Sequence, residues 1–294
     1  SYIIAIGAYL VLLMIYGLVI AHKKVKTTDD MMTGGHKIPF IILVGSLLAT
    51  WCGGGGITGS AGVVYTGGPW VGALTFAAPP IGIILLYFIA GKVRKSNKVT
   101  VPEIMGARYG AVASVISALC VMLAYVGVLA TQLKAAANIL VLLCSSSNIE
   151  MSHGTALAIC TVIVVIITVG GGLVSVAYSD AVSALIMIGG FFLAIPILMH
   201  AASTQGAVLS PEKTTLTGGM SGWTILGYFL PSLALMLGDQ NMLQRFASAK
   251  NSDEAKKSNI GMFIGELLVI ISIIALVTQA AKLYPSLDTP SNVI

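Results

Sequence analysis

One apolar segment, residues 38–66, contains near its middle the stretch Ala49-Thr50-Trp51-Cys52-Gly53-Gly54-Gly55-Gly56. Each glycine in a helix interior costs up to about 1 kcal/mol relative to alanine, so four in succession predict a broken helix. Unpaired backbone groups at mid-membrane depth are tolerated only where they line a cavity or meet a ligand. The alternative is a close helix-packing surface of small residues. The stretch therefore predicts either a broken span beside a binding site or a tight helix contact.

The composition is typical of a chain embedded in a lipid bilayer. Of 294 residues, 56% are hydrophobic and only 9% are charged, and the mean hydropathy is +0.94. Eight apolar runs are long enough to cross about 30 Å of hydrocarbon. They lie at 2–21, 38–66, 71–91, 111–143, 154–173, 175–200, 222–245 and 259–281. We expect an all-α membrane protein with a single transmembrane domain over 1–294, and a tight reversal at the glycines between the fifth and sixth runs.

The basic residues predict the orientation. Thirteen of the 16 fall into three connections, 22–37, 92–110 and 246–258, with Arg245 counted at the edge of the third. Eight alternating spans place all three clusters on one side, which the positive-inside rule makes cytoplasmic. The sequence therefore predicts a multi-pass protein of the plasma (inner) membrane with its N-terminus outside. Within the second connection, Thr100 and Pro102 indicate either the start of a short helix or a solvated loop.

The seventh run, 222–245, shows a second interruption. Pro231 lies in its middle, and Gly238-Asp239-Gln240-Asn241 follows toward its end. It comes five helices after the broken second run, as expected of the first helix in each half of an inverted five-plus-five repeat. Two interrupted helices at corresponding positions indicate a transporter's binding site, where free carbonyls can coordinate Na⁺. We therefore include Met236, Asp239 and Gln240 among the candidate solute-binding residues.

Several further side chains in the apolar runs are candidates. Asp180 is interpreted either as part of a cation path or as a helix N-cap. Trp51 and Tyr125 are candidate solute-facing aromatic residues, since a cationic or sugar-like solute can use an aromatic face. Gln132 is a polar candidate in the fourth run. Glu266, near the start of the last run, is interpreted mainly as a packed carboxylate.

Enzymatic and nucleic-acid-binding functions find no support in the motifs. The chain has no GxSxG, HExxH or Walker A sequence, and no paired carboxylates on a water-facing scaffold. It has no basic stripe interleaved with aromatic residues of the kind that binds nucleic acid. We expect neither an enzyme nor a nucleic-acid partner.

A family resemblance covers nearly the whole chain. It rests on Asp29-Asp30 with Gly34-Gly35, Ser46 to Trp51, Thr100-Val101-Pro102-Glu103 with Arg108-Tyr109, Gly171 to Asp180, and Gln244-Arg245-Phe246 with Ala249-Lys250. Together these residues resemble the sodium:solute symporter family. The resemblance implies a five-plus-five inverted repeat preceded by an extra N-terminal helix at 2–21. The first repeat would cover 38–200, and 222–281 would begin the second repeat, so the chain would be a truncated, N-terminal portion ending after the eighth helix.

The resemblance also implies roles for individual residues. The carbonyls of Ala49 and Cys52 would form half of the main sodium site, and Asp180 would match a carboxylate of a second sodium or its exit path. The sequence Ala49-Thr50-Trp51 followed by the glycines at 53–56 resembles most the choline-transporting branch of the family. In that branch Trp51 and Tyr125 would contact the solute. Ser183 replaces a glutamine common in the family, so choline is one candidate among several.

The predicted function is sodium-coupled symport of a small organic solute by alternating access. The alternative is a non-transporting membrane sensor or receptor that retains the solute-binding fold. The expected partners are the solute, Na⁺ and the lipid bilayer. No cofactor or metal is expected other than Na⁺ as the coupling ion, and the oligomeric state is left open.

Overall fold

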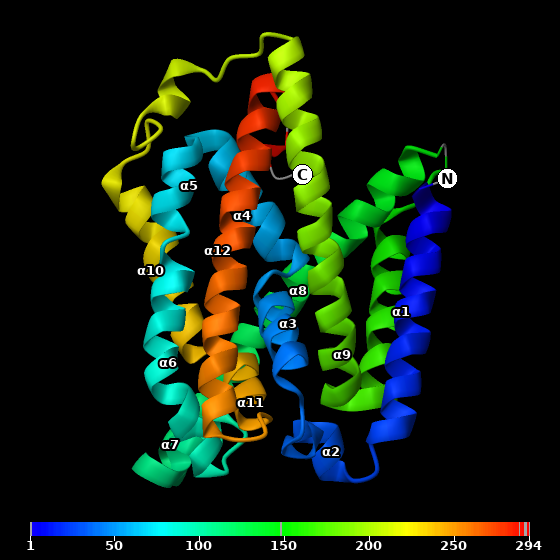
Figure 1. Ribbon diagram of the computed structural model, residues 1–294, viewed down its shortest axis with the longest axis vertical. Helices are drawn as coiled ribbons and strands as arrows, with labels where there is room; N and C mark the ends of the chain where they lie inside the picture. Colours follow the sequence, from blue (N-terminus) through cyan, green and yellow to red (C-terminus); the bar gives the residue numbers. More distant parts are fainter. Residues whose placement is uncertain (1, 148, 288, 291–292, 294) are drawn as a thin grey trace. The chain divides into compact units, whose positions relative to one another are not determined.

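The regular structure of the chain is helical. The computed structural model describes residues 2–147, 149–287, 289–290 and 293. The elements in chain order (Figure 1) are α1 (Tyr2–Lys24), α2 (Thr28–Thr33), η1 (Gly34–His36), α3 (Phe40–Trp51), α4 (Gly54–Gly67), α5 (Pro69–Thr75), α6 (Ala78–Ser96), α7 (Val101–Tyr109), α8 (Ala111–Ser145), α9 (His153–Thr204), η2 (Pro211–Thr214), α10 (Gly222–Gly238), α11 (Gln240–Ala247) and α12 (Ser252–Leu283). The predicted all-α class is confirmed.

Several of these helices can cross a membrane. Among the described residues, five segments are long and apolar enough: Ile4–Lys24, Pro69–Ser96, Ala111–Ser145, Gly172–Thr204 and Ser252–Leu283. The broken pair α3 and α4 adds a sixth. The predicted span at 154–173 corresponds to the part of α9 that precedes Gly172. The predicted span at 222–245 corresponds to α10, with 17 residues, followed by α11. At about 1.5 Å per residue, α10 alone is shorter than about 30 Å of hydrocarbon.

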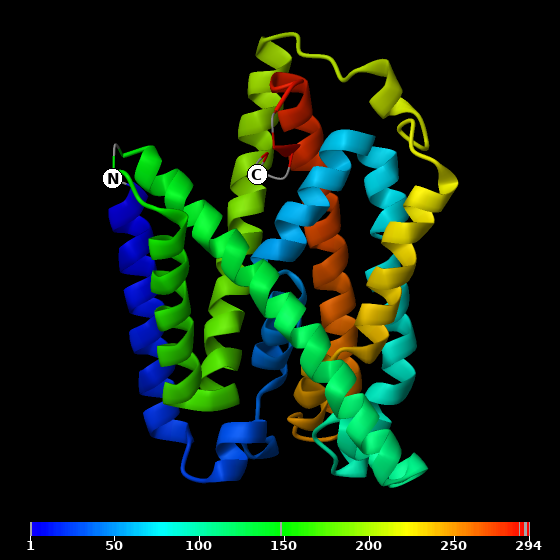
Figure 2. The ribbon, with the colours of Figure 1, turned by 180° about the vertical axis from the view of Figure 1, so that it is seen from behind.

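The predicted helix reversal between the fifth and sixth runs occurs at Gly172. This residue has φ 54° and ψ −154° inside α9, so α9 consists of two helices joined at that point. The first of them lies beside α1 in both ribbon views (Figures 1 and 2). Gly172 leaves no room for a side chain, because a Cβ there would lie 2.5 Å from the carbonyl oxygen of Met31.

The chain divides into two compact units. The first comprises Ser1–Thr50, Ala90–Val182 and Gln240–Ser258; the second comprises Trp51–Ile89, Ser183–Asp239 and Asn259–Ile294. The chain passes between them at the breaks of α3/α4 and α10/α11, and also within α6, α9 and α12. Both predicted helix interruptions therefore coincide with a transition between units.

The first unit has a core at the junction of α3 and α11. Leu43, Leu47 and Phe246 are fully buried there. Its other helices leave large apolar side chains exposed, such as Val112 and Leu123 of α8, the uninterrupted helix that crosses the view of Figure 2. Exposed apolar side chains along a span of this length indicate contact with lipid. This agrees with a membrane environment for α8.

The second unit is built around α4, α5, α6, α10 and α12. Its buried side chains include Val64, Val71, Leu86, Met236 and Val277, one from each of these helices. A Cβ added to Gly82 would lie 2.9 Å from the Cβ of Met236. The absence of a side chain at Gly82 therefore allows α6 and α10 to pack closely. Close packing through small residues is typical of membrane helices.

Two short helices outside the spans are capped by side chains. Thr100 is the N-cap of α7, and its hydroxyl accepts a hydrogen bond from the Glu103 N–H at 3.3 Å. The interpretation of this segment as a short helix is confirmed. The helix α2 was not predicted; Thr27 and Asp30 form a capping box at its start. Such a box satisfies N–H groups that the first turn leaves unpaired.

The capping box of α2 should depend on pH. The Asp30 carboxylate accepts hydrogen bonds from the Lys26 N–H and from the Thr27 hydroxyl and N–H, which lower the pKa of Asp30. A lowered pKa means that the stabilisation is present above the unfolded pKa and is lost as the pH falls through the folded value. We expect amide exchange in α2, corrected for its intrinsic rate, to accelerate below about pH 4. Asp30→Asn should abolish this dependence; an unchanged profile in the variant would contradict the assignment.

Candidate functional site

The second span is broken where the sequence predicted. α3 ends at Trp51, and Gly53 has extended backbone torsions, φ −70° and ψ 161°, as the N-cap of α4. The break is shorter than the predicted four glycines, because Gly54 and Gly56 already belong to α4. Glycine is among the residues preferred at the N-cap position of a helix. Gly55 lies outside the residues whose surroundings the structure describes.

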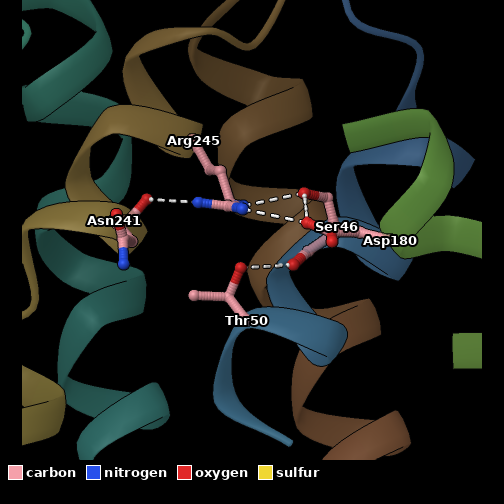
Figure 3. A network of polar contacts seen from close by, with 5 residues as sticks. All are labelled: Ser46, Thr50, Asp180, Asn241 and Arg245. Carbon is pink, nitrogen blue, oxygen red and sulfur yellow. Dashed lines mark hydrogen bonds and ion pairs between the residues drawn. The ribbon is translucent and has the colours of Figure 1, made fainter. Parts of the chain in front are cut away.

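A buried ion pair lies in the first unit (Figure 3). Arg245 Nη2 lies 3.0 Å from Asp180 Oδ2, and the two side chains are 6% and 24% exposed. Ser46 joins them: its hydroxyl accepts a hydrogen bond from Arg245 Nε at 2.7 Å and donates one to Asp180 Oδ2 at 2.9 Å. Arg245, Asp180 and Ser46 thus form a closed triangle of polar contacts from α11, α9 and α3.

The backbone around this triangle holds it in place. A Cβ on Gly45 would lie 2.7 Å from the Cα of Ala181, so the glycine allows α3 and α9 to approach closely beside Ser46 and Asp180. The Thr50 hydroxyl donates to the Ser46 carbonyl at 2.7 Å, and the Asn241 carbonyl accepts from Arg245 Nη1 at 3.4 Å. The arginine is therefore bonded to three different groups, as a buried guanidinium requires.

The geometry corrects two interpretations of charged residues. Asp180 is not a helix N-cap, because its helix begins at Gly172 and Asp180 lies about two turns inside it. Arg245, counted at the edge of the third basic connection, is instead a buried residue, because it is 5% exposed and paired. Sequence reasoning missed Arg245 as a site residue; its place directly after the interruption at Asp239 was the available signal.

Other candidates of the first unit lie beside the second interruption. Tyr125 of α8 accepts a hydrogen bond on its hydroxyl from the Asn241 N–H at 3.0 Å. The Gln240 side chain accepts from the Val101 N–H at 2.6 Å and donates to the Val99 carbonyl at 3.2 Å. These bonds tie the start of α11 to α8 and to the start of α7. Two further candidates, Ala49 of α3 and Gln132 of α8, are half-buried; solute contact by these residues stays a prediction.

The remaining candidates belong to the second unit. Cys52 lies in the break and donates its thiol hydrogen to Glu266 Oε2, with 3.5 Å between sulfur and oxygen. Trp51 is half-buried at the end of α3. Met236 is fully buried against Gly82, and Asp239 is the extended C-cap of α10. The predicted interruption of the seventh run lies at Asp239, because α10 continues through Pro231 and ends at Gly238.

These features define a class of protein. The chain is a polytopic α-helical membrane protein with two interrupted helices, one of which is broken inside an apolar span, and with a buried ion pair in one unit. Discontinuous helices of this kind are typical of secondary transporters. Residues 31–289 match the sodium:solute symporter family, and the chain belongs to that family. The resemblance noted in the sequence is thereby confirmed.

Individual relatives carry different substrates in their names. The high-affinity choline transporter 1 of Drosophila melanogaster is 25% identical over 98% of this chain and 46% of its own length. The Torpedo marmorata protein of the same name is 28% identical over 92% of this chain and 48% of its own. The sodium/proline symporter of Salmonella typhimurium is 26% identical over 78% of this chain and 47% of its own. The chain spans about half the length of these curated relatives.

A solved structure shares the fold. The substrate-bound, outward-open Na⁺-coupled sialic acid symporter matches 97% of this chain and 62% of its own chain, with a TM-score of 0.76 and 16% sequence identity. At that identity the likeness concerns the fold alone. It agrees with the all-helical architecture described above.

Proposed function

We propose that the protein functions in sodium-coupled symport of a small organic solute by alternating access. The observation that carries the proposal is the break in the second span at Cys52 and Gly53, in a chain of this family. The last four carbonyls of an α-helix have no partner within the helix, and Ala49 is among the last four residues of α3. Its carbonyl, with that of Cys52, is available to bind Na⁺ as the first half of a sodium site.

Asp180 extends this proposal to a path for the ion. Its two hydrogen bonds both reach Oδ2, and its side chain keeps 24% exposure while Arg245 is almost fully buried. A carboxylate in this position can meet a passing cation without losing its arginine. The membrane potential then contributes about 2.3 kcal/mol per charge per 100 mV to inward movement.

The arrangement in the membrane is part of the same proposal. We place the N-terminus outside and the three basic connections in the cytoplasm of a cell whose plasma membrane holds the protein. The segment 38–200 would form the first repeat and 222–281 the beginning of an inverted second repeat, after the extra helix α1. The relatives' names make choline and proline the first solutes to test.

The decisive experiment measures uptake into proteoliposomes that contain the full-length protein. Labelled choline, proline, pantothenate and sugars are each offered with and without an inward Na⁺ gradient. Na⁺-dependent accumulation of one solute supports the proposal and names the substrate. Binding without accumulation would instead favour a sensor that retains the solute site.

A glycine pair in α4 tests the role of the break. A Cβ on Gly56 would lie 3.3 Å from the Trp51 carbonyl oxygen, whereas one on Gly59 meets nothing within 4 Å. We expect Gly56→Val to lower Na⁺-dependent uptake by roughly tenfold, equivalent to about 1.4 kcal/mol, because it crowds the carbonyls of the break. Gly59→Val is the matched control and should keep wild-type uptake. Equal uptake by the two variants would show that the break does not contribute to the transport site.

A further inference from the structure

A buried carboxylate in the second unit has no place in the sodium sites proposed above. Glu266 is the fifteenth of the 32 residues of α12 and thus lies at its middle. The sequence had placed it near the start of its span, because the apolar run begins later than the helix does. Glu266 is 2% exposed, and Met262, Val269 and Ile273 on the same helix face are buried with it. The carboxylate therefore points into the unit and not toward lipid or the membrane surface.

The neighbours of this carboxylate come from the broken span. The Cys52 thiol donates to Oε2 at 3.5 Å, and the Trp51 side chain lies within reach of the carboxyl group. Within the described part of the chain, no cationic side chain lies within 4 Å of Glu266, since the ion pair found there joins Arg245 and Asp180. A mid-membrane carboxylate thus meets a weak thiol donor and an indole at the point where the helix is interrupted.

A cation would stabilise this carboxylate. Removing an unpaired carboxylate from water costs several kcal/mol even after relaxation of the surroundings, and a thiol is a weak hydrogen-bond donor. Ionisable groups at this depth are retained where they pair with another charge or mark a substrate pathway. Because the protein supplies no partner in the described residues, the structure points to a cation that arrives from outside the chain.

The neighbours also discriminate between cations. Hard metal ions are held by several oxygen ligands, whereas the side chains that interact with the Glu266 carboxyl group are one thiol and one indole. An organic ammonium group is attracted to a carboxylate and also to the face of an aromatic ring, tryptophan most strongly. We propose that Glu266 is the anionic half of a binding site for the ammonium group of the transported solute, with Trp51 as its aromatic half. This inference rests on the proposed function and narrows its solute to an organic cation.

The test compares ammonium compounds with neutral molecules of the same shape. Calorimetric titration of the purified full-length protein in saturating Na⁺ measures the affinities of choline, tetramethylammonium and ethanolamine. The affinity of 3,3-dimethylbutan-1-ol, the neutral isostere of choline, is measured alongside. We expect the wild-type protein to prefer at least one ammonium compound. Glu266→Gln should weaken the affinity for that ammonium compound on the order of 100-fold, while the affinity for the neutral isostere should change by less than about threefold.

Two further variants test the role assigned to the charge of Glu266. Glu212→Gln removes the same charge from an exposed position of η2 and should leave every affinity unchanged. Glu266→Asp keeps the charge but shortens the side chain, and should lose roughly tenfold in ammonium affinity while keeping the preference over the isostere. Should Glu266→Gln not fold, the aspartate variant carries the comparison alone.

Several results would overturn the inference. It fails if no ammonium compound binds better than its isostere, or if Glu266→Gln keeps the wild-type preference, which would leave the carboxyl with a packing role. It also fails if the variant loses binding of radioactive Na⁺ and keeps that of the ammonium ligand. Na⁺-driven uptake of a neutral solute without ammonium preference would contradict this inference but not the proposed symport. Ammonium binding without Na⁺-driven uptake would support this inference but contradict the proposed symport.

Discussion

Asp180→Asn should lower the free energy of unfolding by about 3–5 kcal/mol, because it leaves the guanidinium of Arg245 buried without its counter-ion. The arginine side chain is 6% exposed, and its remaining bonds go to the neutral Ser46 hydroxyl and Asn241 carbonyl. Neither group carries the negative charge that offsets the cost of desolvating a cation. Chemical and thermal denaturation of the detergent-solubilised protein measures the effect.

A double-mutant cycle separates the pair from its members. Arg245→Gln with Asp180→Asn removes both charges, and we expect this double variant to be more stable than Asp180→Asn alone. Effects that add within about 0.5 kcal/mol would show that the two residues are not coupled. Asp253→Asn, at an exposed position in the first turn of α12, is the matched control. It should cost less than about 1 kcal/mol.

Gly172→Ala is expected to prevent normal folding of the first unit. With φ 54° and ψ −154°, the residue adopts a conformation that is essentially restricted to glycine and costs other residues about 1–3 kcal/mol. The added Cβ would also lie 2.5 Å from the Met31 carbonyl oxygen. Strain and overlap act together, so expression of folded protein should fall sharply in size-exclusion profiles.

The control for this substitution lies in the same helix. Gly189 has ordinary helical torsions, and a Cβ there meets nothing within 4 Å. Gly189→Ala should therefore be neutral or stabilising by up to about 1 kcal/mol. If both alanine variants fold equally well, the reversal at Gly172 does not depend on glycine.

Local sequence patterns predicted the helical architecture and its interruptions. The apolar run 38–66 with its four glycines located the broken span within a few residues, because glycine destabilises a helix wherever it occurs. The glycines before Leu173 located the reversal of α9 for the same kind of reason. Thr100 located the start of α7, since an N-cap bond joins residues only three apart. The resemblance to the family was likewise carried by short motifs.

The sequence-based predictions failed where the structure around a residue depends on segments that are distant in the sequence. Pro231, together with Gly238 to Asn241, indicated the interruption, yet α10 continues through the proline and ends at Gly238. The loss of one backbone bond can be compensated in a membrane helix by its surroundings. Arg245 was counted with the basic residues of the third connection, because nothing in the local sequence distinguishes a buried arginine from an exposed one.

The sequence alone determined the class of the protein, the approximate limits of its helices and the position of its main break, since each depends on residues close together along the chain. Only the tertiary structure decided which charges meet. Asp180 and Arg245 are 65 residues apart, and Cys52 and Glu266 are 214 apart. Such pairs form because close helix contacts, as at Gly45 against Ala181, bring distant segments together. No periodicity or motif in a single sequence encodes that contact.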